Sequence, residues 1–124
     1  MLLRLLVADD AAQTRRARRA VEASLARGEP VLVSLLVIIE AEWVLQSRYE
    51  LDKAETLALL NRLLEARELT FEDEPAIEEA LFQWKASTAC FTDCLIAAHN
   101  RRMGCETTAT FDAKAARLPG FAPV

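Results

Sequence analysis

The chain has 124 residues, of which 52% are hydrophobic, and a formal net charge of −4 at pH 7. This length fits a single domain spanning residues 1–124, with a core that needs neither disulfides nor a structural metal. A negative net charge argues against a protein that binds nucleic acid by bulk charge, but it is compatible with a local basic patch or an acidic metal site.

The first part of the chain predicts a helix followed by a strand. Residues 1–8 are a short apolar segment that fits either a strand or a helical turn. Residues 10–26 predict a helix with Asp9 or Asp10 as its cap. Residues 30–34, Pro-Val-Leu-Val-Ser, are rich in β-branched side chains and follow a proline, a pattern typical of a buried strand.

The rest of the chain alternates helices with strands. Ser34 can cap a helix that runs to about Gln46, and residues 54–66 predict a helix with an apolar face. That face is formed by Leu57, Leu60 and Leu64. Further along, the pattern predicts a strand at 69–71, a helix opened by Asp73 or Glu74 with Pro75, a helix at 92–102 that ends at Gly104, a strand at 107–111 and an edge strand at 121–124.

This alternation favours an α/β fold in which helices cover both faces of a mostly parallel central sheet. In such sheets, functional sites form at the carboxyl ends of the strands. The longest uncharged apolar run, residues 31–39, is far shorter than the roughly 20 residues of a membrane helix. The charged Arg4, Asp9 and Asp10 also make the start unlike a signal peptide or anchor. We therefore expect a cytoplasmic protein without a membrane partner.

Cysteine and histidine usage excludes several kinds of site. The three cysteines, Cys90, Cys94 and Cys105, have neither the even count of a disulfide framework nor the spacing of a zinc site. We expect Cys90 and Cys94 to be reduced packing residues. His99 is the only histidine and no Gly-x-Ser-x-Gly motif accompanies it, which argues against a serine-hydrolase triad.

Three acidic residues are distinguished by their surroundings. Glu40 lies in an apolar helical stretch, where a carboxylate is costly to bury without a cation or hydrogen bonds. Asp93 lies in the first turn of a predicted helix, and Asp112 directly follows a predicted strand. Each has an ordinary explanation as well: pairing with an arginine, compensation of a helix dipole, or a turn. Acids at strand ends and helix starts of one parallel sheet can converge, however, and such oxygen ligands suit Mg²⁺ or Mn²⁺.

The order of the motifs around these acids resembles the PIN domain family. The motifs are Val33-Ser34-x5-Glu40, Phe91-x-Asp93-x2-Ile96-Ala97 and Thr110-x-Asp112. Residues 43–45 and 114–121 are similar to one VapC-like branch of this family, and the resemblance covers nearly the whole chain. Carried over residue by residue, Glu40, Asp93 and Asp112 match the acidic metal site, while Thr110 matches a polar neighbour and Ser34 a strand-end residue.

The resemblance implies a three-layer PIN-like fold and a metal-dependent endoribonuclease, the toxin of a type II toxin–antitoxin pair. Glu40, Asp93 and Asp112 would be the catalytic residues and would hold one or two Mg²⁺ or Mn²⁺ ions, with metal-activated water cleaving RNA. Family members usually form homodimers and are blocked by a small antitoxin. The expected partners are therefore RNA, a cognate antitoxin and a second copy of the chain.

The front of the chain departs from the family pattern. PIN domains open with a strand that ends in Asp-Thr-Asn, directly before a segment such as Val-Leu-Leu-Arg-Leu-Leu. Residues 1–6 here read Met-Leu-Leu-Arg-Leu-Leu, so that motif would lie just before Met1. We expect the 124-residue chain to have a truncated first strand, to lack one metal-binding Asp, and to show weak metal affinity and little nuclease activity. Activity equal to that of an N-terminally extended version would contradict this.

Two alternatives remain beside the nuclease. One is a catalytically impaired PIN-fold interaction protein that binds an antitoxin. The other is a response-regulator receiver domain, because residues 5–10 look like its opening strand and acidic pair. A receiver needs an Asp at the end of a mid-chain strand, whereas Asp52 begins a predicted helix, so this interpretation is disfavoured. Asp9 and Asp10 are better explained as helix caps.

Arginines cluster in the first predicted helix, at positions 15, 16, 18 and 19. The ordinary explanation is a solvated helix face. The sharper hypothesis is that Arg15 and Arg19 contact RNA phosphates and, with Ser34 and Thr110, bind the substrate. Reversing both charges should then lower an RNA affinity that depends on salt.

Overall fold

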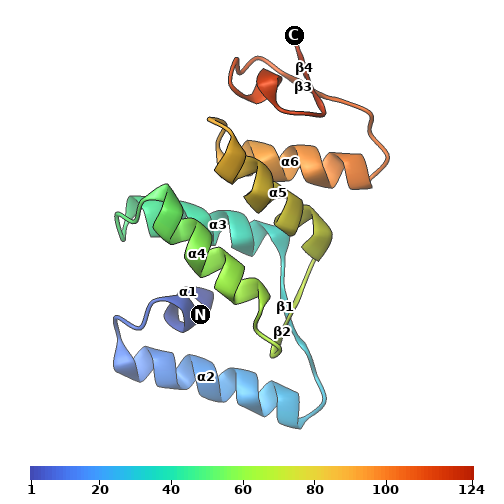
Figure 1. The fold of residues 1–124 in the computed structure, drawn as a ribbon. Helices are drawn as coiled ribbons and strands as arrows, with labels where there is room; N and C mark the ends of the chain where they lie inside the picture. Colours follow the sequence, from blue (N-terminus) through green and yellow to red (C-terminus); the bar gives the residue numbers. More distant parts are fainter. The chain divides into compact units, whose positions relative to one another are not determined.

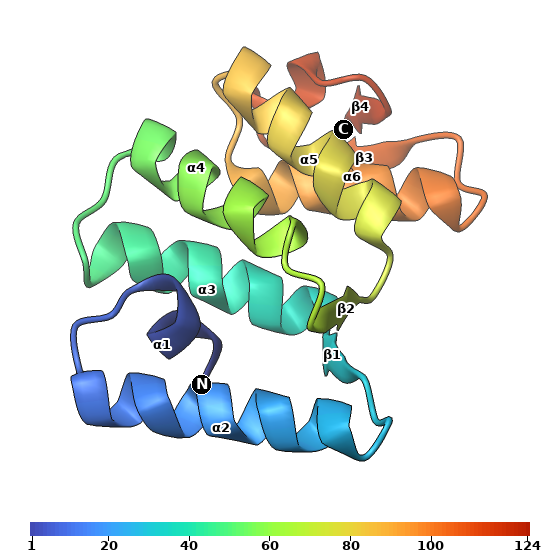
Figure 2. The ribbon, with the colours of Figure 1, turned by 60° about the horizontal axis from the view of Figure 1, so that its bottom comes forward.

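The computed structural model describes all residues from Met1 to Val124, which divide into two compact units, Met1–Glu72 and Asp73–Val124 (Figures 1 and 2). Each unit contains helices and one pair of parallel strands. The single domain expected from the length of the chain stays a prediction, and the two units are described separately. No helix combines the length and the apolar character needed to cross a bilayer.

The first unit is built from four helices and two short strands. In chain order they are α1 (Leu2–Leu6), α2 (Ala11–Ala26), β1 (Val31–Val33), α3 (Leu35–Ser47), α4 (Lys53–Leu64) and β2 (Leu69–Phe71). Of the two structures that fit residues 1–8, a helical turn is the one observed. In both ribbon views α1 lies against α2, on the side that faces α3 and α4 (Figures 1 and 2).

Side-chain caps fix where the longer helices of this unit begin. The Oδ1 atom of Asp10 accepts a hydrogen bond of 3.0 Å from the Gln13 backbone N–H, at the start of α2. Ser34 caps α3 through a 3.3 Å bond from the Val37 N–H, as predicted. Asp52 caps α4, and such caps stabilise a helix by about 1 kcal/mol each.

Strands β1 and β2 pair in parallel, with Val31 opposite Leu69 and Val33 opposite Phe71. The prediction that residues 30–34 form a strand is confirmed, but the prediction that this strand is buried is wrong in part. Val33 is buried, whereas the side chain of Leu32 is 65% exposed. Successive side chains of a strand point to opposite faces, so burial on one face only gives this alternation.

The core of the first unit is an apolar contact between α3 and α4. Helix α3 contributes Ile38 and Leu45, which are almost fully buried. Helix α4 contributes Leu57, Leu60 and Leu63. The predicted apolar face of α4 is therefore confirmed at Leu57 and Leu60, but Leu63 is buried where Leu64 was expected and Leu64 is half-buried.

The second unit contains two longer helices and a second strand pair. Its elements are α5 (Glu74–Ala86), α6 (Phe91–Arg102), β3 (Thr108–Thr110), a 3₁₀ helix η1 (Ala115–Arg117) and β4 (Phe121–Pro123). Helices α5 and α6 pack closely against each other. The rings of Trp84 and Phe91 meet edge to face, with centroids 5.5 Å apart, and Phe91 is fully buried.

Strands β3 and β4 also pair in parallel, with Thr108 opposite Phe121 and Thr110 opposite Pro123. All strand pairing in the chain is therefore parallel, and the predicted α/β class with helices between the strands is confirmed. The strands form two separate two-stranded sheets, one in each unit.

Candidate functional site

Glu40 lies on α3 and is exposed to solvent. The apolar stretch around Glu40 pointed to a carboxylate that would be costly to bury, but the buried acid of α3 is Glu42. The side chain of Glu42 is 8% exposed, and this burial raises its pKa. Residues two positions apart lie about 200° apart around a helix, so burying Glu42 leaves Glu40 on the opposite side.

Asp93 lies in the first turn of α6, half-buried, with buried neighbours Phe91 and Cys94. Its backbone N–H lies 3.5 Å from the sulfur of Cys90, which takes the place of an oxygen cap. The three cysteines form no disulfide. The predicted packing role is confirmed for the buried Cys94 and is wrong for Cys90, which is exposed and caps the helix instead.

Asp112 lies two positions after Thr110, the last residue of β3, and is held by the backbone. Its Oδ1 atom accepts hydrogen bonds from the N–H groups of Lys114 at 2.7 Å and Ala115 at 3.0 Å. These bonds lower the pKa of the Asp112 carboxyl. Its own N–H donates to the Thr110 hydroxyl at 3.0 Å, so Thr110 positions the acid. Asp112 is therefore an ionised carboxylate in a fixed turn at the carboxyl end of a strand.

The carboxyl edge of the β1–β2 pair carries one acid that was not predicted from the sequence. Ser34 follows β1 and Glu72 follows β2, and the Glu72 N–H donates to the Val33 carbonyl at 2.9 Å. The Oε1 atom of Glu72 accepts a 2.8 Å hydrogen bond from the Leu35 N–H, at the positive end of α3. The signal was in the sequence, because parallel strands end at the same edge and both residues directly follow a strand.

The predicted site residues are divided between the units. Glu40 and Ser34 belong to the first unit, and Asp93, Thr110 and Asp112 belong to the second. Within neither unit does a group of three or more His, Cys, Asp or Glu side chains lie close enough to hold a metal ion. The convergence of Glu40 with the two aspartates stays a prediction.

Nearly the whole chain matches the model of one protein family. The model of the PIN domain family matches residues 1–120, nearly the whole chain and both of its units. The chain belongs to the PIN domain family. No curated protein and no solved structure matches it significantly. PIN domains are generally nucleases, so membership supports a nuclease activity for this chain.

The three acids of this PIN domain fit a divalent cation by their chemistry. None of them forms an ion pair, and the side chains of Glu40 and Asp93 form no hydrogen bond. Four other acids are instead paired with arginines, namely Asp9 with Arg4, Glu29 with Arg27, Asp73 with Arg102 and Glu79 with Arg101. Carboxylates whose oxygens have no cationic partner are available as the ligands that Mg²⁺ and Mn²⁺ prefer.

The only histidine of the PIN domain is paired with a carboxylate. His99 Nδ1 lies 2.9 Å from Oδ2 of Asp73, whose other oxygen accepts from the Arg102 guanidinium. Desolvation raises the pKa of Asp73, but the hydrogen bonds from His99 and Arg102 outweigh it and the net shift is downward. Asp73 precedes α5 with a φ of 51° and does not cap the helix with its side chain. This residue therefore ties the start of α5 to the end of α6.

We expect Asp73→Asn to lower the free energy of unfolding by about 1–2 kcal/mol at pH 7, because a charge-assisted bond becomes a neutral one. Asparagine also tolerates a positive φ, so the backbone is left unstrained. A carboxyl with a lowered pKa stabilises the fold above its unfolded pKa and loses this contribution as the pH falls through its folded value. The gap between the variant and the parent should therefore close below about pH 4, as measured by urea unfolding. An equal gap at pH 3 and pH 7 would contradict this role.

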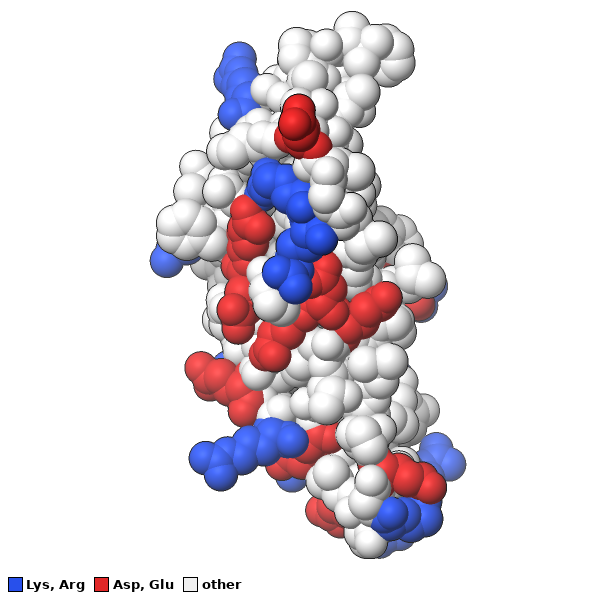
Figure 3. All heavy atoms as spheres, turned by 90° about the vertical axis from the view of Figure 1, so that its right-hand side faces the viewer, with Lys and Arg blue, Asp and Glu red and all other residues white.

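The basic residues predicted to meet RNA lie on α2. Arg15 and Arg19 are exposed and form no ion pair. Asp10 caps this helix as expected, whereas Asp9 accepts hydrogen bonds from Arg4 and from the Tyr49 hydroxyl instead. On the face drawn in Figure 3, acidic and basic side chains lie next to one another without a broad basic field. An RNA contact on this face must therefore be local.

Proposed function

We propose that this PIN domain is an endoribonuclease that depends on Mg²⁺ or Mn²⁺, with Glu40, Asp93 and Asp112 as the metal-binding and catalytic residues. The observation that carries the proposal is the family match over residues 1–120. The sequence motifs around these three acids resemble those of the family, and the acids form no ion pairs. A divalent cation bound there would supply Lewis-acid stabilisation of the phosphodiester and activation of water.

The chain's own residues would act by position and charge. Asp112 is held by two backbone N–H groups and needs no rearrangement to offer its second oxygen. Asp93 lies in the first turn of α6, half-buried and without a side-chain hydrogen bond. Glu40 is exposed on α3, so solvent and ligands reach it. Ser34 and Thr110 would contact the substrate beside the acids, and Arg15 and Arg19 would attract RNA phosphates.

The first test is metal-dependent cleavage of a structured RNA under single-turnover conditions, with protein in excess so that slow cleavage is seen. We expect slow cleavage with Mn²⁺ or Mg²⁺ and none with EDTA. Glu40→Gln should reduce the cleavage rate by about 100-fold. Mutating a residue that only orients a metal ligand already lowers activity by about 10- to 100-fold, and loss of a direct ligand should lower it at least as much. Glu55→Gln, an exposed acid in the first turn of α4, is the matched control and should change little.

Cleavage that persists in EDTA, or equal rates for both variants, would contradict the proposal. Binding of an antitoxin with no cleavage at all would favour the alternative of a catalytically impaired PIN-fold interaction protein.

The toxin role belongs to the same proposal. We expect this nuclease to form a homodimer and to be inhibited by a small cognate antitoxin that is encoded next to it. A neighbouring short reading frame for a DNA-binding protein, with co-purification of its product, would support this role. Growth of cells that is unaffected by the active protein, with or without the neighbour, would oppose it.

A further inference from the structure

A pocket of the first unit has no role in the proposed carboxylate site. Its cavity measures about 680 Å³, within the range of pockets that hold small organic ligands. Three arginines line it: Arg4 from α1, Arg16 from α2 and Arg48 from the end of α3. No acidic side chain is among the lining residues, and Leu3 and Val44 provide apolar wall. The pocket is therefore basic and partly apolar in a chain whose net charge is −4.

Two of the three arginines have guanidinium groups that are not paired with an acid. Arg4 is bound to Asp9 and donates to the Tyr49 hydroxyl at 3.3 Å, so its charge is already neutralised. The Tyr49 hydroxyl in turn donates to Oδ2 of Asp9 at 3.1 Å, which holds the three groups together. Arg16 and Arg48 are exposed and form no ion pair or side-chain hydrogen bond. The free positive charge of the pocket therefore comes from Arg16 and Arg48.

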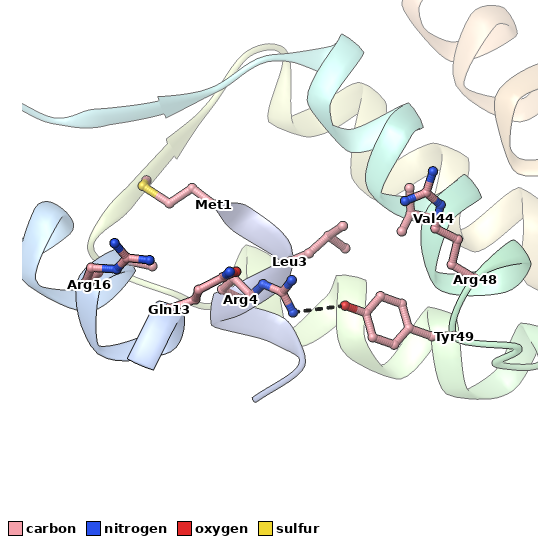
Figure 4. A pocket seen from close by; sticks show the side chains of 9 residues that line it. Met1, Leu3, Arg4, Gln13, Arg16, Val44, Arg48 and Tyr49 are labelled. Carbon is pink, nitrogen blue, oxygen red and sulfur yellow. Dashed lines mark hydrogen bonds between the residues drawn. The ribbon is translucent and has the colours of Figure 1, made fainter. Parts of the chain in front are cut away.

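The placement of these two arginines selects the kind of anion. Figure 4 shows Arg16 and Arg48 on opposite sides of the pocket, with Leu3 and Arg4 between them. A ligand with two negatively charged groups, such as a chain with successive phosphates, can engage both arginines at once. Guanidinium groups bind phosphates through paired N–H donors, and apolar or aromatic walls accept the flat faces of unpaired bases.

We infer that this pocket binds a short segment of single-stranded RNA, with separate phosphates on Arg16 and Arg48 and a base against the wall formed by Leu3 and Val44. The inference rests on the proposed ribonuclease function, and it gives that function a substrate-holding surface apart from the acids. The pocket would also offset the repulsion between RNA and a chain of net negative charge, because such a chain needs a local positive site to hold the strand.

The test measures binding apart from cleavage, in EDTA, by the anisotropy of a labelled eight-nucleotide unstructured RNA. Arg16→Gln/Arg48→Gln should weaken binding by roughly tenfold, through the loss of two charge-assisted contacts. It should also reduce the slope of log affinity against log salt by about 1.4, or about 0.7 for each single-strand phosphate. The matched control is Arg62→Gln/Arg67→Gln, which removes two exposed charges from the same unit outside this pocket. The control should change binding by less than about threefold.

Competition identifies the ligand. An unlabelled dinucleotide with a 5′ phosphate should displace the labelled RNA at much lower concentration than a mononucleotide, because it carries two phosphates. Poly-glutamate that competes as well as RNA would overturn the inference in favour of an acidic peptide. Equal affinities of the two double variants would also overturn it, and so would a parent chain that binds no RNA.

The outcome for the pocket can be separated from the outcome for the proposed function. If RNA is cleaved with metal but both double variants bind equally, the pocket inference fails and the ribonuclease proposal stands. If the parent chain binds RNA through Arg16 and Arg48 but never cleaves it with metal, the ribonuclease proposal fails and the pocket stands. If both hold, the pocket variant should raise KM while kcat at saturating RNA stays near that of the parent.

Discussion

Asp93→Asn is expected to abolish the effect of Mn²⁺ on both activity and stability. The substitution keeps the shape of the side chain but removes the charge that binds the cation. A metal that binds only the folded state raises the free energy of unfolding by about 1.4 kcal/mol at ten times its Kd. The parent chain should therefore melt at a higher temperature with Mn²⁺ than with EDTA, and Asp93→Asn should melt at the same temperature in both. Metal-dependent cleavage should fall by about 100-fold or more.

Asp52→Asn is the matched control for this experiment. Asp52 caps α4 through the Glu55 N–H, and asparagine is an equally good cap, so the fold should be unaffected. The control should keep both the Mn²⁺-dependent rise in melting temperature and the cleavage rate. A variant at Asp93 that still responds to Mn²⁺ like the parent would remove this residue from the metal site, whatever its place in the motif.

Phe91→Ala is expected to cause the largest loss of stability. Phe91 is fully buried at the start of α6, and its ring meets the Trp84 ring of α5 edge to face. Truncation of a buried aromatic residue costs about 3–5 kcal/mol, from lost apolar burial and the cavity left behind. That is a large fraction of the stability of a domain of this size, so we expect partial unfolding at room temperature. Urea unfolding followed by tryptophan fluorescence measures the effect.

Phe82→Ala provides the control with the same change of side chain. Phe82 lies on α5 as well, but its side chain is 70% exposed, so little apolar surface is lost. We expect a change of less than about 0.5 kcal/mol. Similar losses for the two variants would mean that the contact between α5 and α6 is not the core of the second unit.

The positions of helices and strands follow from local sequence patterns. Ser34 and Asp52 precede apolar periodic stretches, and each caps the helix predicted from it, because a cap depends only on residues within one turn. The short strands at 31–33 and 69–71 were recognised from side chains that favour extended backbone. Local chemistry is sufficient for these features.

The exposure of individual acids was not predictable in the same way. An apolar stretch surrounds both Glu40 and Glu42, yet the fold buries Glu42 and exposes Glu40. The hydrophobic pattern of α3 has no strong polar face, so the pattern cannot say which side packs against α4. Leu63 and Leu64 of α4 show the same limit. Which of two neighbouring residues of a helix is buried is therefore decided by the packing of that helix against its neighbour.

Asp73 and the arginine pocket depend still more on tertiary structure. Asp73 directly precedes α5 as expected, but its side chain binds His99 and Arg102, which lie 26 and 29 positions further along the chain. Arg16 belonged to a cluster explained as a solvated face, and nothing in the sequence linked it to Arg48 or Tyr49. Such partners meet only when the helices that carry them have packed.

The sequence by itself determined the α/β class, the parallel pairing, the helix starts and the membership of the PIN family, because each depends on short motifs or on local propensity. Only the tertiary structure decided which acids are neutralised by arginines, which face of α3 is buried and where a basic pocket forms. These properties depend on contacts between residues that are distant in the chain, and such contacts are fixed by the packing of whole elements.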